Sequence, residues 1–327
     1  MDQKRAVIFL ANTPDPEQKK PLMLEEVLFC PILTWVARKL EADGVERFFV
    51  VCGPEYGEAV CACFPARCDV TASDEHPKLL DFVSGGEKVT VIPRPVVPAA
   101  RAGEGYVYSA RGSALAEGWK RGATIFMQDV EGEKGWIALN SVSDIQSVAL
   151  PLRDEIAARH MERGVRILDP KTVYIDPRVE IGRGTMVLPG TLLRGETRIG
   201  ENCTVGPNAA VRDCTVGDET EINASQINES TIGSRTHVGP FAYVRPNSHI
   251  GDGVKVGDFV EVKNSTVGDG TKISHLTYVG DSDVGKQVNF GCGTVTTNYD
   301  GFKKYRCTIG DKSFIGCNTN LVAPAAM

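Results

Sequence analysis

Three absences narrow the function of this chain before any motif is considered. The 327 residues contain no run of about 18 apolar residues, so a transmembrane helix is not expected. The N-terminal segment has too short an apolar stretch, and no small-residue cleavage site, for a signal peptide. Basic residues are not in excess, because 36 Lys and Arg stand against 42 Asp and Glu. We therefore expect a cytoplasmic protein that binds neither membranes nor nucleic acid, although a local basic pocket could still hold a phosphate.

The ten cysteines lack the paired C-x-x-C spacing of zinc modules. The densest group is Cys61, Cys63 and Cys68, which has no histidine near it in the sequence. A soft metal site there is the weaker interpretation, and reduced thiols are expected in a cytoplasmic protein.

The first half of the chain alternates apolar strand patterns with helical ones. Strands are expected at 6–10, 48–52, 89–92, 124–127 and 136–139, and helices at 25–42 and 141–163. Strand–helix–strand order predicts a parallel sheet with helical crossovers. Pro151 lies inside the second helical pattern and is expected to kink or divide it. We predict an α/β domain over 1–140 and a helical linker over 141–170.

The second half has an aliphatic residue at nearly every sixth position, often followed by glycine. The series includes Ile175, Ile181, Val187, Leu193, Ile199, Val205, Val211, Val216, Ile222, Ile232, Val238, Val244, Ile250, Val256 and Val262. A period of six fits neither a helix nor an alternating strand. It fits a triangular solenoid in which each hexad forms one side and one corner, so that about three hexads complete a coil.

In such a solenoid the aliphatic residue points inward, and Gly, Asn and Asp serve the corners, where a left-handed backbone is cheap for them. Hexapeptide coils wind left-handed, against the usual right-handed preference of parallel crossovers. We therefore predict a left-handed parallel β-helix over 171–327.

Five motifs in this half resemble a known family of enzymes. They are 238–246 (VGPFAYVRP), 256–264 (VGDFVEVKN), 274–281 (SHLTYVGD), 288–301 (VNFGCGTVTTNYDG) and 315–324 (IGCNTNLVAP). They resemble the acetyltransferase half of the bacterial bifunctional N-acetylglucosamine-1-phosphate uridyltransferases/glucosamine-1-phosphate N-acetyltransferases. The resemblance implies a homotrimer that moves acetyl from acetyl-CoA to the 2-amino group of glucosamine-1-phosphate, in UDP-N-acetylglucosamine biosynthesis.

The resemblance also implies residue roles. An ammonium group cannot attack a thioester, so a general base is needed, and histidine suits neutral pH. By resemblance that base is His275; a histidine packed in a coil wall is the alternative. Arg245 and Lys263 match the phosphate ligands of the family. The alternative is that they are solvated charges at the edge of the coils. The remaining matches are Tyr278, Asn289 and Lys304 for sugar and phosphate, and Cys292, Asn298, Tyr299 and Cys317 for acetyl-CoA. An acyl-cysteine intermediate at Cys317 is a less favoured alternative.

The N-terminal half departs from the uridyltransferase pattern. Where that family has a glycine-rich phosphate loop, residues 10–22 here contain no glycine, whose small size lets backbone N–H groups approach a triphosphate. Family remnants persist at 112–116, at Gln128–Asp129 and at Asn140, but only ten residues separate Asp129 from Asn140. We interpret this half as a shrunken nucleotidyltransferase-like domain without uridyltransferase activity. Mg²⁺, bound through the vestigial residues Asp129 and Asn140, would be a cofactor only if this nucleotidyltransferase-like half were active.

The sequence leaves one competing function open. A non-catalytic trimeric scaffold, or a regulatory paralogue, would keep the sugar-phosphate site without turnover. The family also continues for further coils after its V-A-P motif, whereas this chain reaches Met327 three residues after Pro324. On that basis the sequence predicts weakened acetyl-CoA binding.

Overall fold

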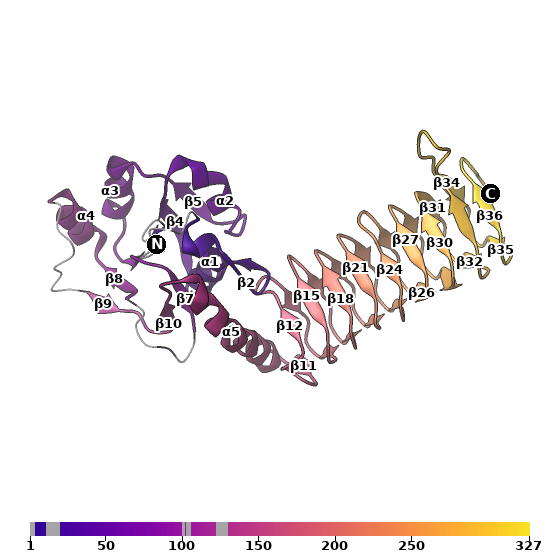
Figure 1. Cartoon of the computed structure of the whole chain (residues 1–327), viewed down its shortest axis with the longest axis horizontal. Helices are drawn as coiled ribbons and strands as arrows, with labels where there is room; N and C mark the ends of the chain where they lie inside the picture. Colours follow the sequence, from indigo (N-terminus) through magenta and orange to yellow (C-terminus); the bar gives the residue numbers. More distant parts are fainter. Residues whose placement is uncertain (1–3, 11–19, 100–101, 103–105, 122–129) are drawn as a thin grey trace. The chain divides into compact units, whose positions relative to one another are not determined.

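The computed structural model describes residues 4–10, 20–99, 102, 106–121 and 130–327. The chain forms two compact units, Met1–Glu155 and Ile156–Met327. The division falls inside helix α5 (Val142–Glu162), which lies within the segment predicted as a linker. Figure 1 shows the chain coloured along its sequence, with the first unit in indigo to magenta.

The first unit is built on a mixed six-stranded sheet. Its order is β5 (Asp69–Ala72), β4 (Val45–Val51), β1 (Lys4–Phe9), β6 (Val89–Ile92), β8 (Tyr108–Ala110) and β9 (Glu131–Gly132). The first four strands are parallel, whereas β8 and β9 are antiparallel to their neighbours. The prediction of a parallel sheet is therefore correct only for its first four strands.

Helices and short strands complete this unit. The helices are η1 (Leu22–Leu24), α1 (Ile32–Ala42), η2 (Pro54–Tyr56), α2 (Gly57–Cys61), α3 (His76–Ser84) and α4 (Gly112–Lys120). Two antiparallel pairs are β2 (Glu26–Val27) with β3 (Cys30–Pro31) and β7 (Val96–Pro98) with β10 (Trp136–Ala138). One apolar cluster packs α1 on the sheet, and a second packs α3 and α4.

Two sequence predictions for this unit need correction. The helix expected over 25–42 begins only at Ile32, because residues 26–31 form the β2–β3 hairpin, with positive φ at Leu28 (46°) and Phe29 (80°). Pro31, which lacks an N–H donor, then precedes the helix, a position that proline tolerates. Helix α5 is one helix of 21 residues that continues through Pro151, so the predicted division does not occur. The strand expected at 124–127 lies outside the described residues.

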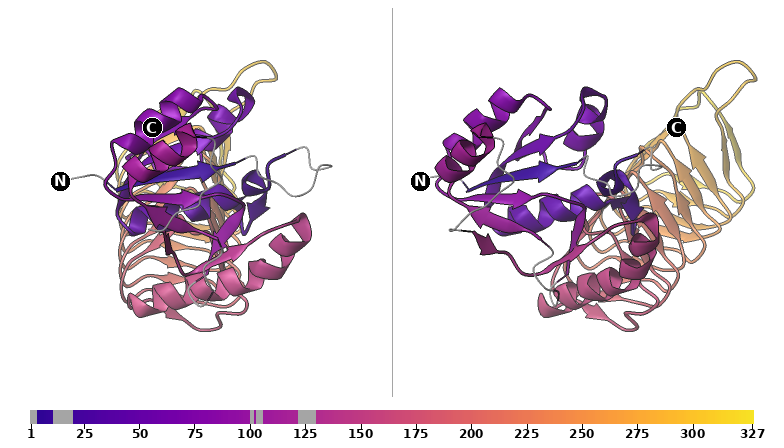
Figure 2. Two further views of the ribbon diagram at one scale, coloured as in Figure 1. Left: turned by 90° about the vertical axis from the view of Figure 1, so that its left-hand side faces the viewer. Right: turned by 60° about the vertical axis from the view of Figure 1, so that its left-hand side comes forward.

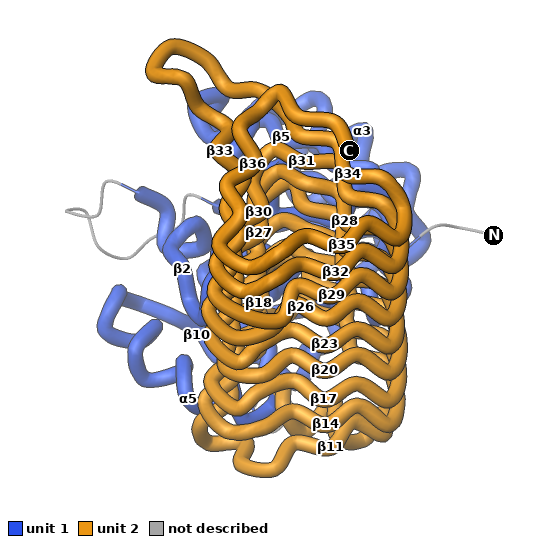
Figure 3. The backbone as a smooth tube through the Cα atoms, turned by 90° about the vertical axis from the view of Figure 1, so that its right-hand side faces the viewer, with its two compact units in different colours: residues 1–155 blue, residues 156–327 orange. Residues whose placement is uncertain are grey.

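The second unit is a parallel β-helix with three sheets (Figure 1). The first sheet contains β11 (Arg166–Ile167), β14 (Met186–Val187), β17 (Thr204–Val205), β20 (Glu221–Ile222), β23 (His237–Val238), β26 (Lys255–Asp258), β29 (Lys272–His275), β32 (Asn289–Phe290) and β35 (Phe314–Ile315). In Figure 3 its labelled strands follow one another up a single column.

The other two sheets repeat the same arrangement. The second contains β12 (Tyr174–Ile175), β15 (Leu192–Arg194), β18 (Ala210–Arg212), β21 (Gln226–Asn228), β24 (Tyr243–Val244), β27 (Glu261–Lys263), β30 (Tyr278–Gly280), β33 (Val295–Thr297) and β36 (Asn320–Val322). The third contains β13 (Glu180–Ile181), β16 (Arg198–Ile199), β19 (Thr215–Val216), β22 (Thr231–Ile232), β25 (His249–Ile250), β28 (Thr266–Val267), β31 (Ser282–Val284) and β34 (Cys307–Ile309). The left-handed β-helix predicted from the hexads is confirmed as the fold of this unit.

The hexad residues fill the interior of the coils. Every member of the series named above is buried except Ile181, which is half-buried. Equivalent residues stack in register, as in the pairing of Val244 with Val262 and of Val262 with Val279. Because the register is preserved, a side chain at one position of a coil lies directly beside its counterpart one coil later.

The corners only partly follow the prediction. Asn202, Asn208, Asn247 and Asp281 have φ between 49° and 62°, as expected for corner residues that tolerate a left-handed backbone. Phe241, Phe259 and Leu276 also have positive φ, at 58°, 56° and 44°. These three bulky residues were not predicted at corners.

One loop leaves the coil outline. Between β33 and β34 the chain extends away from the stacked strands, near the yellow end of the colour scale (Figure 2). A bridge between Tyr299 and Lys304 pairs the two sides of this loop. No helix in the described part of the chain has the length and apolarity to cross a membrane.

Candidate active site

A cleft of about 360 Å³ lies where β24, β27 and β30 end. Arg245 follows β24, and its N–H bonds to the carbonyl of Val262, so the next residue, Lys263, lies one coil above it. Lys304 reaches the same cleft from the loop after β33. Three cations from three segments therefore converge on one surface depression, which is the arrangement that a phosphate requires.

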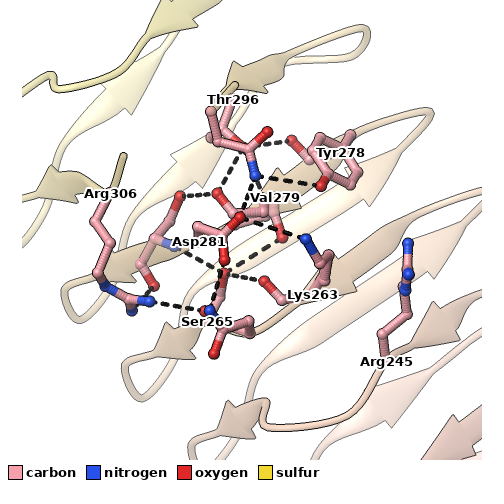
Figure 4. Close-up of polar contacts among 12 residues, drawn as sticks. Arg245, Lys263, Ser265, Tyr278, Val279, Asp281, Thr296 and Arg306 are labelled. Carbon is pink, nitrogen blue, oxygen red and sulfur yellow. Dashed lines mark hydrogen bonds and ion pairs between the residues drawn. The ribbon is translucent and has the colours of Figure 1, made fainter. Parts of the chain in front are cut away.

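Asp281 is the centre of the polar network beside this cleft (Figure 4). Its carboxylate accepts hydrogen bonds from Asn264 Nδ2 at 2.5 Å and from Asn298 Nδ2, and it lies 3.5 Å from Lys263 Nζ. Burial alone would raise the pKa of Asp281, but the Asn264 hydrogen bond and the charge of Lys263 outweigh it and lower the pKa. The carboxylate is thus held ionised, and it fixes the ammonium group of Lys263 in place.

The two lysines of the cleft influence each other. A hydrogen bond between their amines, together with the attraction of Asp281, raises the pKa of Lys263. The same hydrogen bond, and repulsion by the Lys263 charge, lower the pKa of Lys304. Adding a dianionic phosphate would relieve this repulsion, so the cleft is electrostatically prepared for an anion. Arg245 is held by Glu261, with 2.9 Å between Nη1 and Oε1.

His275 ends β29 on the neighbouring sheet and pairs in register with Asp258 of β26. Its Nδ1 contacts Asp258 Oδ1, and this hydrogen bond lowers the pKa of the Asp258 carboxyl. An ionised carboxylate can only accept, so Nδ1 donates this hydrogen bond, and in the neutral imidazole the lone pair is on Nε2. The imidazole is 55% exposed and is not packed into a coil wall. His275 is therefore chemically ready to accept a proton at Nε2.

The other predicted residues divide into two groups. Tyr278 and Asn298 join the Asp281 network, with 3.5 Å between Asn298 Nδ2 and the Tyr278 hydroxyl. Asn298, predicted to contact acetyl-CoA, thus has its side chain in the Asp281 network beside the cationic cleft. Asn289 begins β32 and pairs with Lys272, on the same sheet as His275.

The residues predicted to contact acetyl-CoA otherwise lie further along the coils. Cys292 is half-buried, and its carbonyl accepts the N–H of Asn318 at 2.8 Å. Cys317, which directly precedes Asn318 in the sequence, is exposed. The hydroxyl of Tyr299 donates to the carbonyl of Gly301 at 2.7 Å within the projecting loop.

Asp258 and Asp281 are functional candidates that the sequence analysis missed. Both lie inside motifs already quoted, and each contacts a predicted residue 17 or 18 positions away, Asp258 with His275 and Asp281 with Lys263. That separation is one coil. Moving one coil length back from His275 and one coil length forward from Lys263 would have found both carboxylates.

Of the two vestigial metal ligands predicted in the N-terminal unit, only Asn140 lies among the described residues. Asp129 lies outside the described residues. Asn140 accepts a hydrogen bond from Arg94 Nη2, and its N–H donates to Asp144 Oδ2 at 2.7 Å. Within the part of the chain that the structure describes, no three His, Cys, Asp or Glu side chains are arranged to hold a metal ion.

Comparison with known proteins identifies relatives of this chain. The family model described as bacterial transferase hexapeptide (six repeats) matches residues 229–264. "Bifunctional protein GlmU" of Clostridium beijerinckii is 48% identical over 225 residues, covering 69% of this chain and 48% of that protein. The protein of the same name from Alkaliphilus oremlandii is 51% identical over 191 residues, covering 58% and 42%. The resemblance to the bifunctional GlmU proteins is confirmed.

The similarity to the GlmU proteins covers only part of their length. The chain spans about half the length of the curated GlmU relatives it matches. Among solved structures, the acetyltransferase domain of PglB from Neisseria gonorrhoeae in complex with acetyl coenzyme A aligns with 84% of this chain and 97% of that chain, at 14% identity and a TM-score of 0.31.

Proposed function

We propose that this chain transfers acetyl from acetyl-CoA to the 2-amino group of glucosamine-1-phosphate, within UDP-N-acetylglucosamine biosynthesis. The observation that carries the proposal is the pair of features at adjoining coil corners. The cleft with three cations lies where β30 ends, and the histidine whose Nδ1 is held by a carboxylate ends β29, the preceding strand of the chain. The similarity to GlmU proteins supports the same assignment.

The proposed mechanism assigns each group one task. Arg245, Lys263 and Lys304 hold the phosphate, and the Asp281 network keeps Lys263 in position. His275 Nε2 takes a proton from the sugar ammonium, and the freed amine attacks the thioester carbonyl. The C–S bond then breaks, the acetyl group stays on nitrogen as an amide, and coenzyme A leaves as its thiol after taking up a proton.

We propose further that the active form is a homotrimer. Phe241, Phe259 and Leu276 are 60%, 58% and 57% exposed, and we call them the apolar corner column. The two phenyl rings stack with centroids 5.5 Å apart. A left-handed backbone costs an ordinary residue roughly 1–2 kcal/mol, and exposure in one chain gives little in return. A neighbouring copy that covers the column, next to Asp258 and His275, would supply that compensation.

An acetyl-transfer assay tests the main proposal. Purified protein is given glucosamine-1-phosphate and acetyl-CoA, and free thiol is measured together with binding of the sugar phosphate by calorimetry. We expect thiol release proportional to enzyme and dependent on the sugar. Binding without thiol release, at millimolar acetyl-CoA, would instead favour the scaffold alternative.

For the N-terminal unit we propose that uridyltransferase activity is absent, on the basis of the glycine-free segment 10–22. Protein given UTP, N-acetylglucosamine-1-phosphate and Mg²⁺ should release no pyrophosphate above background. Release that scales with protein concentration would contradict this.

A further inference from the structure

A second cleft, of about 370 Å³, lies in the first unit at the amino ends of its parallel strands. Its lining includes Lys4, the first residue of β1, and Val45, the first residue of β4. The end of α1 forms another side, through Lys39 and Leu40. Ligands of open α/β sheets bind at the carboxyl ends of the strands. This cleft is at the opposite edge, so the expected nucleotide site of such a fold does not explain it.

The cleft is positively charged in an acidic protein. The chain carries a formal net charge of −6. The lining nevertheless has two carboxylates, Asp43 and Glu133, against five cations, Lys4, Arg5, Lys39, Lys88 and Lys134. Clustered like charges destabilise a folded unit unless an opposite charge is nearby. An anion bound in the cleft would therefore reduce the repulsion among these positive charges.

Two of the lysines are not neutralised by the unit itself. Lys4 Nζ donates to the backbone carbonyl of Asp43 at 2.7 Å, a neutral acceptor that leaves the ammonium charge in place. Lys134 has no ion pair among the residues the structure describes. By contrast Lys39 pairs with Asp43, and Lys88 lies 2.8 Å from Glu131. Arg5 Nη1 donates to the carbonyl of Phe82, which is also a neutral acceptor. With Glu131 counted, three carboxylates stand against five cations, so the net charge of the cleft is about two.

The wall behind these charges is apolar. The indole of Trp136 is 3% exposed and faces Lys39, whose Nζ lies 5.9 Å from the ring centroid. Leu40 and Val45 complete this wall and are 2% and 3% exposed. Low-dielectric walls strengthen the field of nearby charges, which favours a compact, highly charged ligand over a dispersed one.

We propose that this cleft binds a small soluble anion with a phosphate or diphosphate group, at a site separate from the acetyltransferase centre. Lysine ammonium groups bind phosphate as point charges. Lys4 and Lys134 provide the net attraction, and Lys39 and Lys88 shift from their carboxylate partners toward the ligand. Binding stabilises the first unit by mass action.

Inorganic pyrophosphate is the probe, with indole fluorescence as a local signal. The three tryptophans of the chain, Trp35, Trp119 and Trp136, all lie in the first unit. Occupancy of the acetyltransferase cleft is therefore not reported directly by fluorescence. We expect saturable quenching that weakens about tenfold or more in Lys134→Glu and in Lys4→Gln, because each loses a charged ligand contact.

Two variants separate this proposal from its alternatives. Lys78→Glu, at an exposed position of α3 outside the cleft, makes the same charge change as Lys134→Glu and should leave the affinity within about twofold. Arg245→Ala should leave it unchanged, so failure here and failure of the proposed function are distinguishable. Equal weakening by Lys78→Glu, or quenching that does not saturate below tens of millimolar, would overturn the proposal. Circular dichroism spectra that match the parent protein confirm that the variants fold.

Discussion

At the scale of single residues, the proposed chemistry depends on carboxylates that hold other groups in place. Asp258 orients His275, and Asp281 orients Lys263. Neither carboxylate touches the proposed reacting atoms, yet each fixes the protonation state or position of a group that would. The resulting predictions separate proton transfer from binding.

His275→Ala should lower the acetylation rate by a factor on the order of 10² to 10⁴, the usual contribution of a positioned general base. Sugar-phosphate affinity measured by calorimetry should stay unchanged, because the cations of the cleft hold the phosphate without the imidazole. His249→Ala, an exposed histidine on the third sheet, is the matched control and should retain full activity. Loss of binding in His275→Ala would contradict the separation of roles.

Asp258→Asn should lower kcat by about tenfold to 100-fold, the usual cost of losing an orienting partner. The amide N–H₂ can donate to Nδ1 and so favours the imidazole tautomer that has its proton on Nε2. The KM for the sugar phosphate should not change. The kinetic constants of Asp258→Asn and Asp258→Glu together test this, since glutamate restores the carboxylate and should recover part of the rate.

Arg245→Ala should weaken sugar-phosphate binding by about 1.5–3 kcal/mol, because a charged hydrogen-bond partner is removed. Arg212 provides the matched control. It lies on the same sheet two coils earlier, pairs with Glu229, and does not line the cleft. If Arg212→Ala weakened calorimetric binding equally, the effect would be general electrostatics and not a ligand contact.

At the scale of elements, helix α5 contains an acid-sensitive position. His160 is 2% exposed, and neither ring nitrogen has a hydrogen-bond partner among the described residues. Burial, with repulsion from Arg159 and Arg163, lowers its pKa from 6.5 to about 4. In the unfolded chain the imidazole therefore takes up a proton at a higher pH than in the folded one.

The stability linked to His160 is present in full above pH 6.5 and is lost as pH falls toward 4. The loss amounts to about 3 kcal/mol at its limit. Urea unfolding at pH 7 and pH 4.5 should show a smaller acid destabilisation in His160→Leu than in the parent chain. The exposed control His237→Leu should keep the parent's pH dependence.

Sequence reasoning succeeded for elements whose pattern is repeated and failed where tertiary context decides. Each hexad is supported by its neighbours, so one slip such as Val216 does not hide the β-helix. The helix expected over 25–42 rested on apolar spacing through Val27 and Leu28, which equally suits the buried hairpin that forms there. The candidate ligand-binding residues were predicted from their motifs, whereas Asp258 and Asp281 were missed because their contacts are made one coil away.

At the scale of the whole molecule, the proposed homotrimer depends on the apolar corner column. Phe259→Asp places a charge at the centre of that column and should convert a trimer to a monomer in light scattering at micromolar concentration, with activity lost in parallel. Leu168→Asp changes an exposed apolar residue at the start of the coils and should leave the trimer intact. A parent chain that is already a stable monomer would contradict the trimer proposal.

The in-register stacking of coils gives the proposed sugar-phosphate site a fixed spacing between its charged groups. Neighbouring strands of a sheet lie about 4.8 Å apart, so groups from successive coils meet a ligand at fixed steps. Arg245 and Lys263 occupy adjoining steps of one such series. Moving a charge up or down by one coil would therefore shift the recognised phosphate by about one sugar-ring width while the backbone stays the same. Substrate length could be retuned by point substitution, without any change in fold.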